Sequence, residues 1–259
     1  MNAFQLSTVL AVLCVALLAL TGRVPYIVEF RSLWRRALAA FLFTEILAIA
    51  TFLPVTTRTP EAFDPEGIWF PLVFATHAAL ALFLFLWWRL RGDIRLAEFL
   101  SLSSDRLGDK LQQGLWYGAG CWIFAVAATV TMGNFGEVAG AYDQPATPPP
   151  VVVWMAGLSL AQKLAIIAVS MSVEEGFFRA FLQPRIGLVP TSIVFALGHF
   201  SYDLPMLVLG VFAVSLVIGR CFDRTGDLLP CMVAHAVFNG VQLLIVLPAV
   251  VSSWGTVPL

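Results

Sequence analysis

The feature that most constrains this chain is a series of long apolar runs separated by short polar segments. A helix needs about 20 mostly apolar residues to cross a hydrocarbon core of about 30 Å. Within lipid, every backbone polar group must be paired inside its own segment, which favours helices. The sequence therefore predicts an all-α, polytopic transmembrane bundle, whose long runs are residues 3–20, 37–55, 68–88, 113–132, 151–173, 204–219 and 228–252.

The composition supports a membrane protein and argues against other classes. Of the 259 residues, 59% are hydrophobic and 12% are charged, whereas about 25% are charged in an ordinary soluble domain. The net charge of -1 provides no basic surface to replace phosphate counterions, so we expect membrane lipid and no nucleic acid as a partner. The 4 cysteines lie singly in apolar runs, without the spacing of a zinc or disulfide framework.

The basic residues of the loops predict the membrane topology. Most of the 15 Lys and Arg residues fall between the first two runs, between the third and fourth, and after residues 173 and 219. Basic loops are retained on the cytoplasmic side, so this alternation requires an eighth crossing in the short segment 186–200. We therefore expect about eight helices in a single integral-membrane domain, 1–259, in the cytoplasmic membrane if the host is prokaryotic.

Ionisable side chains inside the apolar runs are the candidates for function. A charge near the bilayer centre costs about 2.5–3.5 kcal/mol on insertion scales, so it usually faces a cavity or a partner. Most such residues lie in the last third of the chain, which predicts a site among the last four helices. The candidates are Glu45, His77, Lys163, Glu174, Glu175, Arg179, His199, His235 and Asn239.

The three candidates that precede the last third of the chain have simpler explanations. Glu45 and His77 have no partner nearby in the sequence and are readily explained as packing residues. Lys163 is expected to extend its amine toward the interface or to pair with an acid.

Two adjacent glutamates end the run 151–173. Glu175 and Arg179 are four residues apart, which places them on one helix face at ion-pair distance. Glu174 points about a third of a turn away and lacks that partner. We expect Arg179 to hold Glu175, leaving Glu174 free to act as a base, although two solvated charges at a helix end would give the same pattern.

Two histidines and an asparagine complete the candidate group. His199 ends the segment 186–200, while His235 and Asn239 share one face of the last helix. A carboxylate and an imidazole can take a proton from a water, and an imidazole beside a carboxamide can donate to a developing oxyanion. Each histidine alone could be a packing residue, but together these groups fit peptide-bond hydrolysis without a covalent intermediate.

The order and spacing of these residues resemble a known family. The motifs Glu174-Glu175-x-x-x-Arg179, Phe195-x-x-x-His199 and His235-x-x-x-Asn239 are similar to those of the CAAX protease and bacteriocin-processing family of intramembrane endopeptidases, which includes the Ras-converting CAAX endopeptidase. The resemblance covers about residues 150–250, the core of the family, and no motif matches before them.

The resemblance implies an intramembrane glutamate endopeptidase. In it, Glu174 and His199 would activate the water, His235 and Asn239 would form the oxyanion hole, and Glu175 and Arg179 would support the site. Two His and one or two Glu could bind Zn²⁺, but Asn239 is a poor zinc ligand, so we favour a site without metal or cofactor.

The expected substrate is a membrane-associated protein or peptide, reached from the cytoplasm. Two other functions stay open: a non-proteolytic membrane scaffold or immunity protein of the same fold, and a proton-coupled transporter. One conflict also stays open, since a straight crossing by residues 186–200 would place His199 near the outer face, away from Glu174.

Overall fold

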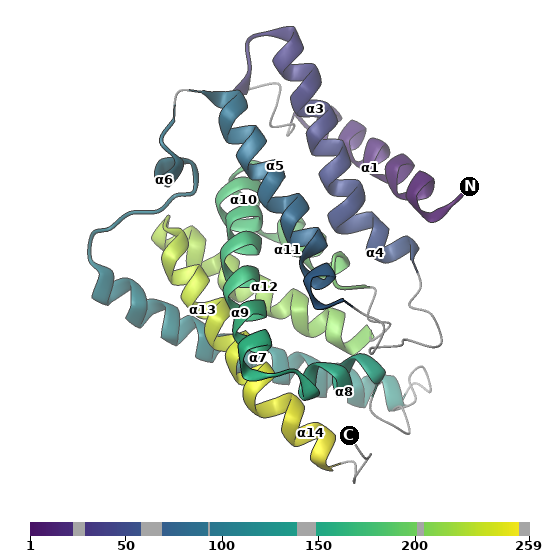
Figure 1. Ribbon diagram of the computed structural model, residues 1–259, viewed down its shortest axis with the longest axis vertical. Helices are drawn as coiled ribbons and strands as arrows, with labels where there is room; N and C mark the ends of the chain where they lie inside the picture. Colours follow the sequence, from purple (N-terminus) through teal and green to yellow (C-terminus); the bar gives the residue numbers. More distant parts are fainter. Residues whose placement is uncertain (23–28, 58–68, 93, 139–148, 201–204, 254–259) are drawn as a thin grey trace.

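The computed structural model describes residues 1–22, 29–57, 69–92, 94–138, 149–200 and 205–253 (Figure 1). All regular structure in these ranges is helical, which confirms the predicted all-α bundle. The helices are α1 (Ala3–Leu20), α3 (Leu33–Leu47), η1 (Ala48–Phe52), α4 (Leu53–Thr56), η2 (Phe70–Phe74), α5 (Ala75–Arg91), α6 (Leu96–Phe99), α7 (Leu107–Val138), α8 (Pro150–Gly157), α9 (Leu160–Glu175), η3 (Gly176–Leu182), α10 (Gln183–Ile186), α11 (Leu188–Leu197), α12 (Pro205–Thr225), α13 (Leu228–Val241), η5 (Gln242–Val246) and α14 (Leu247–Ser253).

The number of membrane crossings differs from the expected eight. In the part of the chain that the structure describes, five helices are long and apolar enough to cross, or six if one bent pair counts as a single span. The five are Ala3–Leu20, Leu33–Thr56, Phe70–Arg91, Leu107–Thr131 and Leu228–Ser253. The chain is therefore an integral, multi-pass membrane protein, and its described residues contain fewer candidate spans than the run lengths predict.

The bent pair of helices shows that the predicted run 151–173 is not one straight helix and that its helical structure continues beyond residue 173. The chain turns by 109° between α8 and the helix Leu160–Ile186, because Leu158 is extended and Ser159 caps α9 through a reciprocal capping box with Gln162. The acids lie inside this long helix, which continues through the π-helical segment η3. At 1.5 Å per residue, Glu174 lies about 18 Å before Ile186.

The helix of the segment 186–200 is too short for the full crossing that we expected. Its helix, α11, has 10 residues and spans about 15 Å, half of the hydrocarbon core. Gly187, at φ 92°, reverses the chain between α10 and α11. The rings of Phe178 and Phe195 then pack 4.8 Å apart, so α11 folds back along η3. His199 thereby returns toward the depth of Glu174, which removes the conflict noted above.

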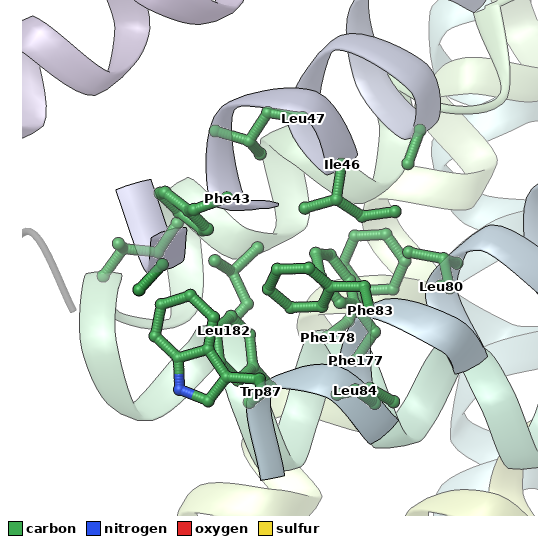
Figure 2. Close-up of a cluster of buried hydrophobic side chains, with 14 of the residues drawn as sticks. Phe43, Ile46, Leu47, Leu80, Phe83, Leu84, Trp87, Phe177, Phe178 and Leu182 are labelled. Atoms are coloured by element: carbon green, nitrogen blue, oxygen red, sulfur yellow. The ribbon is translucent and has the colours of Figure 1, made fainter. Parts of the chain in front are cut away.

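The helix through Ile186 occupies the middle of the bundle. Figure 1 shows α9 and α10 between α3 and α5 on one side and α7 and α13 on the other. Aromatic side chains join α5 to η3: the ring of Phe181 lies 4.9 Å from those of Phe83 and Trp87. Figure 2 shows this core, in which residues from α3 also take part.

A pair of glycines brings α7 against α13. A Cβ on Gly114 would lie 2.5 Å from Val233, and one on Gly118 would lie 2.7 Å from Val237. Gly114 and Gly118 are four residues apart, the spacing of the small-x-x-x-small motif that lets membrane helices approach closely. Helix α13 carries two of the candidate site residues, so this contact helps to fix the site.

Two arginines from different helices meet the same acid at one face of the bundle. Glu29, which precedes α3, lies 3.7 Å from Arg91 at the end of α5 and 2.6 Å from Arg185 on α10. The opposite loops fall on residues 58–68, 139–148 and 201–204, outside the described residues. The compartment that each face meets therefore stays a prediction.

Candidate active site

The ion pair predicted between Glu175 and Arg179 is present and fully buried. Nε of Arg179 lies 3.0 Å from Oε2 of Glu175, and both side chains have 0% exposure. A terminal nitrogen of Arg179 also donates to Oγ of Ser215, on α12, at 3.0 Å. Arg179 is thus an interior residue and not a loop charge, which corrects its use in the topology prediction.

The second oxygen of Glu175 contacts the last helix. Nδ1 of His235 lies 2.6 Å from Oε1 of Glu175. An ionised carboxylate only accepts hydrogen bonds, so Nδ1 carries the proton. The other ring nitrogen, Nε2, then faces Glu174 and donates only when the ring is doubly protonated.

Glu174 has a different partner on each side. Its Oε1 is 2.8 Å from Nε2 of His77, on α5. Its Oε2 is 4.0 Å from Nε2 of His235 and has no hydrogen-bond partner among the described residues. The carboxyl group is largely buried, with 11% of the side chain exposed. One oxygen of Glu174 is therefore hydrogen-bonded, and the other is left open, that is, without a hydrogen-bond partner among the described residues.

His199 follows α11 and is held by its own helix end. Its Nδ1 lies 2.9 Å from the carbonyl oxygen of Phe195, and its ring is near enough to Glu174 for the two to interact electrostatically when the imidazole is charged. The preceding residue, Gly198, allows a close approach to η1, since a Cβ there would lie 2.8 Å from the carbonyl oxygen of Ala50. The amino-terminal helices therefore help to position His199.

Asn239 lies one turn beyond His235, as predicted, and its amide nitrogen donates to Oγ of Ser170 at 2.9 Å. Because a carboxamide has two N–H donors, one remains for another acceptor. Ser170 is on α9, so this contact adds a second polar link between α9 and α13.

Of the remaining candidates, His77 contacts the site, whereas Lys163 contacts the backbone. His77 was expected to be a packing residue but contacts Glu174, and no spacing rule could have linked two residues 97 positions apart. Nζ of Lys163 donates to the carbonyl oxygen of Ala156 at 2.8 Å, at the bend after α8, so it pairs with backbone instead of an acid. Glu45 is half-buried on α3.

The same side chains include types that can bind a metal ion. Among the described residues, no group of three or more His, Cys, Asp and Glu side chains is placed to hold a metal ion. Metal independence stays a prediction that a chelation experiment can test.

Fold and site together define a class: a multi-pass helical membrane protein with a cluster of two glutamates, three histidines and an arginine, all buried or half-buried. Such a cluster of ionisable groups inside a membrane bundle is characteristic of a functional site.

Comparison with known proteins finds a family model that matches part of the chain. Residues 156–241 match the Rce1-like family, described as type II CAAX prenyl endopeptidase Rce1-like. The matched segment contains every residue of the three motifs, which confirms the resemblance seen in the sequence.

The other comparisons are more limited. The chain is 39% identical over 69 residues to an uncharacterized protein, YpbD, of Bacillus subtilis (strain 168). That stretch is 26% of this chain and 36% of YpbD, so the two share only part of their lengths. No solved structure matches the chain.

Proposed function

We propose that this protein is an intramembrane endopeptidase that hydrolyses a peptide bond in a membrane-associated protein or peptide. One observation carries the proposal: the open Oε2 of Glu174 lies 4.0 Å from Nε2 of His235, inside a segment of a CAAX-type protease family. One shared water can bridge such a gap at about 2.8 Å from each atom.

The proposed reaction uses that water as the nucleophile. Glu174, assisted by His199, takes a proton from the water as its oxygen attacks the carbonyl carbon of the substrate. The carbonyl π electrons move to oxygen, and the resulting oxyanion accepts hydrogen bonds from Asn239 and from a doubly protonated His235. The oxyanion then re-forms the carbonyl, the C–N bond breaks, and Glu174 returns its proton to the leaving amine.

The supporting pair has a separate task in this scheme. Glu175 orients His235 through Nδ1, and Arg179 balances the charge of Glu175 within a fully buried pair. The division of labour between two adjacent carboxylates follows from their positions on the helix, a third of a turn apart.

We further propose that the site opens toward the basic face formed by Glu29, Arg91 and Arg185, which is the cytoplasmic face under the positive-inside rule. Leu228, the first residue of α13, precedes His235 by about 10 Å of helix. In this proposal, water and an extended peptide approach along that end of α13.

The test is cleavage by the purified, full-length protein. The family description names a CAAX prenyl endopeptidase, so the first probes are a quenched fluorescent peptide ending in a farnesylated CAAX sequence and the same peptide without the farnesyl group. The termini of membrane proteins from cells that express wild type or Glu174→Gln provide a search that assumes no substrate.

We expect Glu174→Gln to abolish cleavage and Glu45→Gln, a matched change in another membrane helix, to leave it intact. Full activity of Glu174→Gln on an authentic substrate would contradict the proposal. Proton flux in liposomes that depends on Glu174, without a peptide product, would indicate the transporter instead.

A further inference from the structure

We infer that His77 is a positioning residue of this site: its Nε2–H holds Oε1 of Glu174 and thereby fixes the other carboxylate oxygen toward the reacting water. The inference rests on the proposed function, and it extends the site beyond residues 156–241, the segment that the family match covers. It also gives the amino-terminal half of the chain a direct part in the site.

The contact has the geometry of a strong hydrogen bond. The two atoms are 2.8 Å apart and largely shielded, with 18% of the His77 side chain and 11% of the Glu174 side chain exposed. A hydrogen bond to an ionised group in such a setting is short and about twice as strong as a neutral one. It also offsets the cost of burying a carboxylate near the middle of a membrane helix.

The bond selects between the two oxygens of Glu174. With Oε1 held by His77, Oε2 is the atom that faces Nε2 of His235. A carboxylate without this restraint would rotate about its terminal torsion, which has a broad energy profile. Since misplacing a catalytic group by about 1 Å can reduce a rate by about 10²-fold, the restraint matters for the chemical step more than for substrate binding.

The fold holds His77 firmly in this position. His77 shares one face of α5 with the buried residues Leu80, Leu84 and Trp87. That face packs against η3, where Cδ1 of Leu84 lies 3.3 Å from the position of a Cβ on Gly176. On its other side, the ring of Phe74 lies 6.1 Å from the imidazole in an edge-on arrangement. The histidine is therefore placed by the same aromatic core that supports the helix of Glu174.

The kinetic test compares three variants of the full chain on the cleaved probe peptide. His77→Leu removes the donor, His77→Gln keeps an N–H donor near the position of Nε2, and Thr76→Leu is an exposed neighbour that serves as control. We expect His77→Leu to lower kcat about 10- to 100-fold with KM nearly unchanged. His77→Gln should restore most of that loss, and Thr76→Leu should behave as wild type.

Two kinetic results would overturn the inference. One is wild-type kcat in His77→Leu while Glu174→Gln is inactive, which would leave the proposed function standing without a role for His77. The other is equal loss in folded His77→Leu and His77→Gln, which would mean that the imidazole carries a proton itself.

A spectroscopic measurement tests the contact without activity. The chain has 3 histidines, so a ¹H–¹⁵N spectrum of histidine-labelled wild type contains few imidazole signals, and the one lost in His77→Gln identifies His77. We expect an Nε2–H tautomer for that ring. A ring protonated at Nδ1 alone would overturn the inference, even if no substrate were cleaved.

Discussion

Nδ1 of His235 lies 2.6 Å from Oε1 of Glu175, across the interface between α13 and α9. The same carboxylate binds Arg179 through its other oxygen. A fully buried residue therefore sets the orientation of the imidazole that faces Glu174, and stability and orientation depend on one side chain.

Replacing Glu175 should destabilise the protein strongly. Glu175→Gln leaves the fully buried guanidinium of Arg179 without its counter-charge, and breaking one partner of a buried pair typically costs about 3–5 kcal/mol. Unfolding of the detergent-solubilised protein measures the effect. The double variant Glu175→Leu with Arg179→Met removes both charges and should recover much of the stability without restoring cleavage. A single variant as stable as wild type would contradict this account.

Alanine substitutions of Asn239 and of its partner Ser170 should reduce cleavage to different extents. Asn239→Ala removes a proposed oxyanion donor, and such a loss typically reduces kcat by about 10²–10³-fold. Ser170→Ala removes only the acceptor that holds the carboxamide at 2.9 Å, so a much smaller reduction is expected. Steady-state kinetics on the same peptide separate the two. If Asn239→Ala retained wild-type kcat, the carboxamide would have no part in the oxyanion hole.

The glycine contact between α7 and α13 should be intolerant of side chains. In Gly118→Val, the new Cβ would approach Val237 to 2.7 Å, and overpacking of this kind typically costs about 1–3 kcal/mol. Because α13 carries His235, cleavage should fall as well. Gly108→Val, on the same helix with nothing within 4 Å, is the matched control. Equal melting temperatures of the two variants would show that the stability of the protein does not depend on the close approach of α7 and α13.

Chelation should not inhibit cleavage. Under the proposed mechanism, the residues of the site act on the water directly, so dialysis against EDTA or 1,10-phenanthroline should leave kcat unchanged. Inactivation that added Zn²⁺ reverses would instead assign the Glu and His side chains as metal ligands.

Asp227 should make stability depend on pH in the acidic range. It precedes α13 and accepts hydrogen bonds from Nζ of Lys110 at 2.8 Å and from Oγ of Ser103 at 2.7 Å. Burial alone would raise the pKa of Asp227, but these hydrogen bonds outweigh it and lower that pKa below the ordinary value. A group with a lowered folded pKa stabilises the protein above its unfolded pKa, about 3.9, and that stabilisation is lost as pH falls through the folded pKa.

Unfolding of wild type and Asp227→Asn at several pH values measures this effect. Asparagine can still cap α13, so the variant isolates the charge. We expect wild type to be more stable by about 1–3 kcal/mol at pH 6 and the difference to diminish below pH about 4. A difference independent of pH would exclude the ionised carboxylate as its source.

The helical class and most of the candidate site residues follow from the sequence because they depend on local rules. Run length predicts membrane helices, and the four-residue spacing predicts the Glu175–Arg179 pair and the shared face of His235 and Asn239. The crossing count was less predictable. An apolar run has the same composition whether it spans the bilayer straight, bends after Gly157 or reverses at Gly187.

By itself, the sequence determined that this chain forms membrane helices and that its buried charges gather in one third of its length. Only the tertiary structure decided which groups meet. It folded α11 back so that His199 approaches Glu174, and it brought His77 to the same carboxylate from α5. Periodicity reports which residues share a face of one helix, whereas contacts between distant helices depend on how their side chains pack, and no spacing in the chain encodes that.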